Sequence, residues 1–272
     1  MTASRPLELL HLDAAVARVP GRSFGPFDVS LAAGERVAIL GPSGAGKSTL
    51  LRMMAGERAL HGGDALFEAR PLAQWPPRTL AQRRAVLPQS HAVAFGMPVE
   101  LVVSLGRIAR EPDPQQAQIV SKALLAACAG HLAGRRFDTL SGGEQARVQL
   151  ARVLAQLWDA RDGLLLVDEP LAALDPGLQF ELMDAMREFA QSRGHALVAV
   201  LHDINQALAG FERLWLVQDG HLVADLPANG GAAAPLERLF GIGLRCIDTE
   251  DGRVAVLARR AVPTASPLAQ PA

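Results

Sequence analysis

The chain has 272 residues, of which 49% are hydrophobic, 20% charged and 4% aromatic, and its formal net charge is −1. The apolar content excludes a disordered chain, and the near-zero charge argues against a general nucleic-acid binder. Its two cysteines, Cys128 and Cys246, are isolated, which excludes a disulfide framework and indicates a reducing compartment. No apolar run approaches the roughly 20 residues of a membrane-spanning helix, and residues 1–12 lack the apolar core of a signal peptide, so we expect no membrane crossing.

Strands come first along the chain. Short apolar stretches predict strands over residues 7–31, with turns at Pro20-Gly21 and Gly25-Pro26. Residues 36–40 read as a buried strand, residues 49–55 as a helix, and residues 56–88 as a further β-rich piece. From about residue 90 to 138 the composition is helical, and Asp113 is expected to cap a helix that begins at Pro114.

Helices and strands alternate in the second half. A helix follows Ser141, and a strand over 164–167, a helix over 178–192 and a strand over 196–201 come next, with a hairpin turning at Asp219-Gly220. This order predicts an α/β fold, with a parallel-sheet nucleotide-binding core, an antiparallel β piece and a helical insertion. We expect a main domain over 1–240 with a helical subdomain at about 90–157, and a short extension over 241–272 that frays from Val262.

A glycine-rich loop joins the predicted strand 36–40 to the helix that follows it, and its sequence matches the phosphate-loop pattern in full. Glycines there let backbone N–H groups converge on phosphate oxygens at a helix N-terminus. Of the 27 basic residues only Lys47 and Lys122 are lysines, so an ammonium is retained where β- and γ-phosphates would lie. The predicted phosphate-binding residues are Gly41, Pro42, Ser43, Gly44, Ala45, Gly46, Lys47, Ser48 and Thr49, and the Ser48 hydroxyl would ligate Mg²⁺.

Two carboxylates follow the apolar strand 164–167 and would lie at the carboxyl edge of the sheet. Asp168 is suited to hold Mg²⁺ through water, and Glu169 is suited to polarise an attacking water as a general base. An acidic residue at a strand end is a weak signal by itself. Paired with the phosphate loop, it indicates nucleoside triphosphate hydrolysis.

A double glycine opens the helix that follows the insertion, in Leu140-Ser-Gly-Gly-Glu-Gln145. Ser141 and Glu144 have the spacing of a capping box, which does not explain the glycines. Glycines behind a serine at a helix N-terminus expose N–H donors to an anion. Together with the phosphate loop and the paired carboxylates, this segment resembles the signature motif of the ATP-binding cassette (ABC) ATPases, and the resemblance covers roughly residues 7–240.

The resemblance implies further site residues. Gln89 matches the glutamine that senses Mg²⁺ and water, Asp175 matches the D-loop, and His202 matches the switch histidine that contacts the γ-phosphate. In this family two subunits form a head-to-tail homodimer with two ATP molecules at the interface. The implied catalytic residues are therefore Glu169, His202 and Gln89, the metal ligands are Ser48, Gln89 and Asp168, and ATP is also contacted by Asp175 and by Ser141, Gly142, Gly143 and Gln145 from the signature motif.

Two positions depart from the family pattern. The family stacks adenine on an aromatic residue ahead of the phosphate loop, but this chain has no tyrosine and the register falls near Arg18. The Arg18 guanidinium could stack on the base, or Phe24 could take that place. Leu171 stands where a small hydroxyl residue is usual, which we interpret as a packing change.

Three longer segments, residues 83–89, 99–107 and 142–158, resemble the ATPases of bacterial iron-complex importers, and most of all those of haemin importers. Residues 240–248 and 23–27 instead resemble cobalamin-import ATPases, and a ferric siderophore remains an alternative cargo. The resemblance implies an integral-membrane permease, an indirect link to a substrate-binding protein, no nucleic acid, and a peripheral position on the cytoplasmic face of the bacterial inner membrane.

Two other classes of function fit the sequence less well. Soluble ABC ATPases that act on ribosomes or DNA carry two cassettes, a long coiled-coil insertion or zinc-binding cysteines, and this chain has one phosphate loop and two separated cysteines. A module that binds ATP without hydrolysing it is opposed by the presence of Glu169 and His202.

Overall fold

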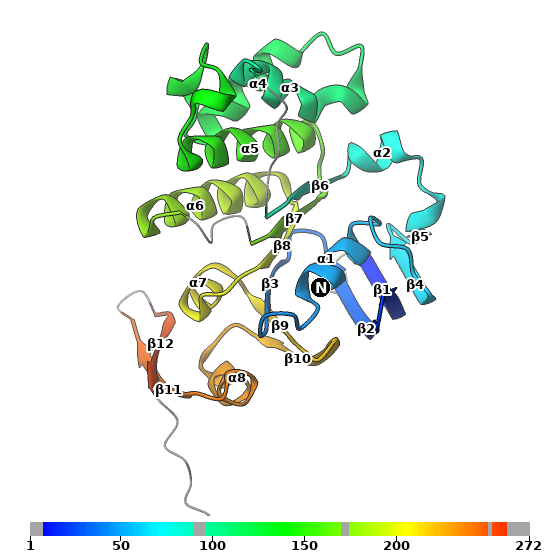
Figure 1. The fold of residues 1–272 in the computed structure, drawn as a ribbon, viewed down its shortest axis with the longest axis vertical. Coiled ribbons are helices and arrows are strands. Elements are labelled where there is room, and N and C mark those ends of the chain that lie inside the picture. The colour runs from blue at the N-terminus through cyan, green and yellow to red at the C-terminus, as the bar shows by residue number, and fades with distance from the viewer. Residues whose placement is uncertain (1–7, 90–95, 170–173, 250–251, 260–272) are drawn as a thin grey trace, which may run out of the picture.

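A twisted six-stranded sheet forms the centre of the computed structural model, which describes residues 8–89, 96–169, 174–249 and 252–259 (Figure 1). The strands from β9 to β6 run parallel, and β10 pairs antiparallel with β9 at one edge. The carboxyl ends of the parallel strands therefore meet at one edge of the sheet. In spatial order the strands are β10 (His221–Pro227), β9 (Arg213–Gln218), β3 (Arg36–Leu40), β8 (Ala196–Val200), β7 (Leu164–Asp168) and β6 (Arg84–Leu87).

Alternate residues of the central strands enter two different hydrophobic cores, because successive side chains of a strand point to opposite faces. Ala38, Leu165 and Leu197 belong to the core shared with the helical lobe, whereas Val37 and Leu164 pack toward α1 and the second sheet. Both faces of the sheet are therefore covered. The expected parallel-sheet core is confirmed.

The second sheet is antiparallel and four-stranded, in the order β2-β1-β4-β5. Its predicted turn at Pro20-Gly21 is confirmed, with Gly21 at φ 78°. The second predicted turn is wrong, because Gly25-Pro26 lies inside β2: the Gly25 N–H donates to the Gly220 carbonyl (2.7 Å), and a Cβ at Gly25 would lie 2.3 Å from the Ala15 carbonyl oxygen. The strands are β1 (Glu8–Val19), β2 (Arg22–Ala32), β4 (Gly62–Phe67) and β5 (Arg70–Pro71).

A helical lobe of α3, α4 and α5 lies at the top of Figure 1, and α6 runs between it and the sheets. The prediction for α4 was two residues early: Asp113 does not cap that helix, since its carboxylate accepts from Arg107 Nε (2.7 Å) and from the Gln115 N–H (3.1 Å). The β-rich stretch expected over 56–88 also contains α2. The α-helices of the described residues are α1 (Lys47–Met54), α2 (Pro77–Ala81), α3 (Val99–Ser104), α4 (Gln116–Ala126), α5 (Gly142–Leu157), α6 (Pro176–Arg193), α7 (Ile204–Gly210) and α8 (Ala233–Phe240).

Short 3-10 turns connect several of these elements: η1 (Leu72–Gln74), η2 (Leu105–Arg110), η3 (Gly130–Leu132), η4 (Phe137–Thr139) and η5 (Gly230–Ala232). The extension expected after residue 240 begins with a two-stranded hairpin of β11 (Gly243–Asp248) and β12 (Val254–Arg259), which lies beside α7 and α8. The end expected to fray from Val262 lies outside the described residues. Within the described ranges, no helix combines the length and the apolar character needed to cross a bilayer.

Candidate active site

The ends of neighbouring parallel strands bring the predicted site residues together. The glycine loop follows β3, His202 follows β8, the paired carboxylates end β7, and Gln89 follows β6. These four strands are adjacent in the sheet, in the order β3-β8-β7-β6. Residues separated by more than a hundred positions in the chain therefore face one another at one edge.

A cavity of about 330 Å³ lies over the glycine loop. Two glycines of the loop are sterically required: a Cβ at Gly41 would lie 2.1 Å from the Val217 carbonyl oxygen, and one at Gly46 would lie 2.6 Å from Phe24 Cδ1. Gly46 also has φ 108°, which disfavours any side chain. The cavity is lined by Phe24, Ser43, Gly44, Ala45, Gly46, Lys47, Ser48, Thr49, Glu169 and His202.

Lys47 is 4% exposed and folds back onto its own loop. Its Nζ donates to the carbonyl oxygens of Gly41 (2.9 Å) and Pro42 (3.1 Å) and lies 3.8 Å from Glu169 Oε1. Burial lowers the pKa of the Lys47 ammonium, and the nearby carboxylates of Glu169 and Asp168 oppose that shift. The two carbonyls take two of the three N–H donors of the ammonium, so an anion in the cavity could accept from the third. No side chain of the described residues caps the N-terminus of α1, so its first N–H groups also face that anion.

Ser48 and Asp168 meet although they are far apart in the sequence. The Ser48 Oγ donates to Asp168 Oδ1 at 2.8 Å, and Asp168 is 4% exposed. Burial raises the pKa of the Asp168 carboxyl, and the hydrogen bond from Ser48 and the charges of Arg52 and Lys47 act against this rise. These are the hard oxygen donors that Mg²⁺ prefers. Among the described residues no group of three or more His, Cys, Asp or Glu could hold a metal by itself, so phosphate oxygens and water would have to complete such a site.

Glu169 is the centre of the polar cluster. Its Oε1 lies 2.7 Å from His202 Nε2, and its Oε2 accepts a hydrogen bond from Gln89 Nε2 at 3.0 Å. The backbone of Glu169 has φ 47°, in the left-handed region that non-glycine residues rarely adopt. Such strain at a cavity wall is typical of a functional position, where the surrounding structure holds the side chain in place.

The signature residues do not line this cavity. Ser141 caps α5 as predicted: its Oγ accepts from the Glu144 N–H (3.3 Å), and the Ser141 N–H donates to Glu144 Oε2 (2.8 Å). Gln145 Nε2 donates to the Leu140 carbonyl oxygen (3.1 Å). Asp175 caps α6, accepting from the Leu178 N–H (3.0 Å), and a Cβ at Gly143 would lie 2.6 Å from Leu178 Cδ2. The beginnings of α5 and α6 are therefore neighbours, on a part of the surface separate from the cavity.

Arg18 is not among the residues that line the cavity. It is exposed on β1, where its carbonyl oxygen accepts from Arg58 Nη2 (3.0 Å). Phe24 lines the cavity instead, and the Arg22 guanidinium lies 4.8 Å from its ring centroid while donating to the Gly44 carbonyl oxygen (2.9 Å). Sequence reasoning missed Arg22, because its two partners are recognisable only once β2 lies beside the glycine loop. Leu171 lies outside the described residues.

Comparison with known proteins agrees with this geometry. The family model described as ABC transporter matches residues 24–172. The chain belongs to the ABC transporter family. It is an ATP-binding protein of that family and hydrolyses ATP, as the import subunits of these systems do.

The chain is similar over most of its length to curated import ATPases. It is 46% identical to the Hemin import ATP-binding protein HmuV of Pseudomonas aeruginosa over 219 residues, which are 79% of this chain and 85% of that protein. It is 44% identical to the protein of the same name from Pseudomonas fluorescens over 246 residues, covering 88% and 96%.

Solved structures share the fold. A chain from the inward-facing conformation of an ABC transporter has a TM-score of 0.78 at 23% identity, with 93% of this chain and 98% of that chain covered. A nucleotide-free ATP-binding cassette from an ABC transporter has a TM-score of 0.71 at 20% identity, covering 86% and 95%. The expected ABC ATPase fold is confirmed.

The base-binding side of the cavity can be tested with two substitutions. We expect Phe24→Leu, which keeps apolar bulk against Gly46 but removes the aromatic face, to weaken ATP binding by about 10-fold, since base–aromatic stacking contributes about 1–3 kcal/mol. Inorganic tripolyphosphate should bind both forms equally. Arg18→Ala should change neither affinity. Calorimetric titration measures the affinity for each ligand. A loss of ATP affinity confined to Arg18→Ala would show that adenine stacks on Arg18 and not on Phe24.

Proposed function

We propose that the chain is the ATP-hydrolysing subunit of an importer that carries haemin, a metal chelate, through a separate membrane permease. The observation that carries the proposal is the convergence of Gln89 and His202 on Glu169 beside the phosphate loop. The cargo rests on the relatives at 40–46% identity that are named hemin import ATP-binding proteins. The permease and the binding protein, and not this chain, would select the cargo. Uptake of cobalamin or of a ferric siderophore is therefore an alternative outcome of the transport test.

In the proposed reaction each side chain has one task. Lys47 and the N–H groups of the loop bind the triphosphate, and Glu169 accepts the proton of the attacking water. His202 holds the Glu169 carboxylate in place from one side and Gln89 holds it from the other, so the base is oriented before the nucleotide binds. Arg22 holds the glycine loop in place by donating a hydrogen bond to the Gly44 carbonyl oxygen.

The Mg²⁺ assignment follows from the donor set. Ser48 and Asp168 would hold the ion, with Gln89 as a further oxygen ligand, and the ion would neutralise charge that develops on the phosphates. The 2.8 Å contact between Ser48 Oγ and Asp168 Oδ1 supports this, because it brings two oxygens to one point beside the loop.

The proposal of a dimer rests on the signature-motif residues, which do not line the cavity of their own chain. Ser141 caps α5 and the two glycines that follow it begin the helix, and none of these three residues lines the cavity over the chain's own phosphate loop. A second copy placed head to tail would bring them, with Gln145 and Asp175, to the nucleotide of its partner. The division into an ATPase domain over 1–240 and an extension over 241–272, the permease contact through the helical lobe, the indirect link to a substrate-binding protein and the position on the cytoplasmic face of the inner membrane belong to the same proposal.

The cargo is tested with the assembled transporter in lipid vesicles. We expect ATP to drive uptake of haemin when the chain is combined with its permease and binding protein, and Glu169→Gln to abolish that uptake. Cobalamin and a ferric hydroxamate serve as competing cargoes under the same conditions. Uptake of either of these without uptake of haemin would overturn the assignment while leaving the ATPase intact.

A further inference from the structure

The C-terminal hairpin of β11 and β12 is fastened to α7 by one side chain. The Asn205 Nδ2 donates to the Val256 carbonyl oxygen (3.1 Å), and the Val256 N–H donates to Asn205 Oδ1 (2.7 Å). A carboxamide presents the same donor and acceptor as a peptide group, so Asn205 pairs with the edge of β12 as a neighbouring strand would. Val256 is 5% exposed whereas Asn205 is exposed, so both bonds are partly buried.

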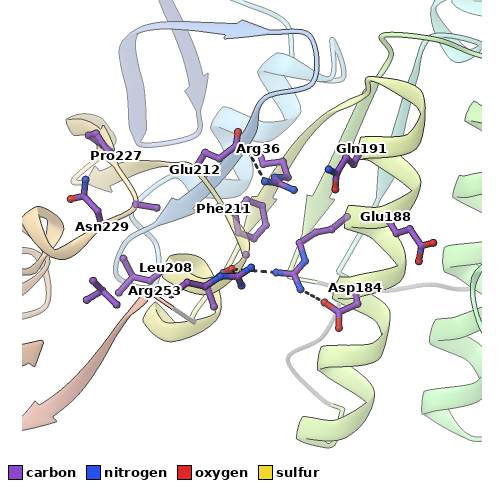
Figure 2. A pocket seen from close by; sticks show the side chains of 16 residues that line it. Arg36, Asp184, Glu188, Gln191, Leu208, Phe211, Glu212, Pro227, Asn229 and Arg253 are labelled. Carbon is purple, nitrogen blue, oxygen red and sulfur yellow. Dashed lines mark hydrogen bonds and ion pairs between the residues drawn. The ribbon is translucent and has the colours of Figure 1, made fainter. Parts of the chain in front are cut away.

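A second contact holds the other end of α7. The Ala209 carbonyl oxygen accepts from Arg253 Nη1 of the hairpin (2.5 Å) and from Arg187 Nη1 of α6 (3.4 Å). The last carbonyls of a helix lack partners within the helix, and cations are favourable there. Arg253 lies against the last turn of α7 (Figure 2). It lines a cavity of about 660 Å³ together with residues of α6 and α7, and on α6 Asp184 pairs with Arg187.

These contacts matter because α7 has only seven residues. Isolated helices of that length are not stable in water, so the position of α7 is set by what it packs against. Its N-terminus is capped by Asp203, which accepts from the Gln206 N–H (3.0 Å), and Gln206 Nε2 donates to Gln179 Oε1 of α6 (2.7 Å). His202 comes directly before that cap, so a shift of α7 moves the imidazole.

We propose that the hairpin braces α7 and that Asn205 is a positioning residue for His202 in ATP hydrolysis, an inference that rests on the proposed role of His202 at Glu169. The contact between His202 Nε2 and Glu169 Oε1 is 2.7 Å, and a displacement of about 1 Å at such a contact can cost up to 10²-fold in rate. The residues that bind phosphate lie in the loop after β3 and at the start of α1, whereas the hairpin packs against α7 and α8. Loss of the brace therefore lowers turnover and leaves nucleotide binding unchanged.

The test compares two brace variants with a matched control. We expect Asn205→Ala and Arg253→Ala each to lower the kcat for ATP hydrolysis about 10-fold, with the KM and the calorimetric affinity for ATP unchanged. Arg245→Ala is the control, because Arg245 lies on β11 of the same hairpin and makes no hydrogen bond or ion pair within the described part of the chain. The control should keep the kcat of the unaltered protein.

A second readout does not depend on activity. The NMR resonance of the His202 imidazole carbons is assigned by its loss in His202→Ala. Its chemical shift should change in Asn205→Ala and stay the same in Arg245→Ala. An unmoved signal, an unchanged kcat in both brace variants, or a loss of ATP affinity that matches the loss of kcat would overturn the inference. A His202→Ala variant with full turnover would instead overturn the proposed role of His202, so the two failures are distinguishable.

Discussion

Replacing Glu169 by glutamine is expected to leave ATP binding intact and to slow hydrolysis by a factor on the order of 10²–10⁴, the range that a positioned general base contributes. The amide keeps the size of the carboxylate and can still accept from Gln89, but it cannot take a proton from water. It also removes the negative charge that faces Lys47 at 3.8 Å and His202 at 2.7 Å. Phosphate release under saturating Mg·ATP measures the effect.

Glu188→Gln is the matched control for this variant. Glu188 is an exposed carboxylate of α6 that lines the cavity beside the hairpin rather than the one over the glycine loop (Figure 2). Its replacement should leave hydrolysis unchanged. If Glu169→Gln turned over ATP at the rate of the unaltered protein, another group would have to be the base.

Replacing Lys47 by alanine is expected to weaken ATP binding by about 10–100-fold, because a hydrogen bond to a charged group contributes about 1.5–3 kcal/mol. The side chain is buried and aimed at the loop carbonyls of Gly41 and Pro42, so its ammonium is held where the phosphates arrive. Calorimetric titration of ATP into the variant measures the change.

Lys122→Ala provides the control for Lys47→Ala, since it removes the other lysine of the chain from an exposed position on α4. Its affinity for ATP should match that of the unaltered protein. Lys47→Arg should fail to restore binding, because a planar guanidinium cannot replace a compact ammonium in this tight loop. Unchanged affinity in Lys47→Ala would contradict the phosphate role.

The sequence predicted the features that depend on neighbouring residues. The glycine loop between β3 and α1, the capping box of Ser141 and Glu144, and the end of the helix expected over 178–192, which the structure places at Arg193, are all local, because turn and cap geometry depends on a few adjacent residues. The α/β alternation predicted a parallel sheet with the two carboxylates at its carboxyl edge, but it did not predict the order of the strands in that sheet.

The features that the sequence could not predict depend on distant partners. Gly25 reads as a turn, but the Ala15 and Gly220 carbonyls next to it keep it inside a strand. Asp113 reads as a helix cap, but the buried guanidinium of Arg107 takes its carboxylate. The pairing of Asn205 with Val256 joins residues 51 positions apart, so no local pattern indicates it.

In the proposed dimer two copies of the chain enclose ATP, each completing the other's site with Ser141 and the glycines that follow it. The most direct test is the molar mass of Glu169→Gln by sedimentation equilibrium, with and without saturating Mg·ATP. We expect a monomer without nucleotide and a dimer with it. A monomer under both conditions would show that ATP is not enclosed between two copies of the chain.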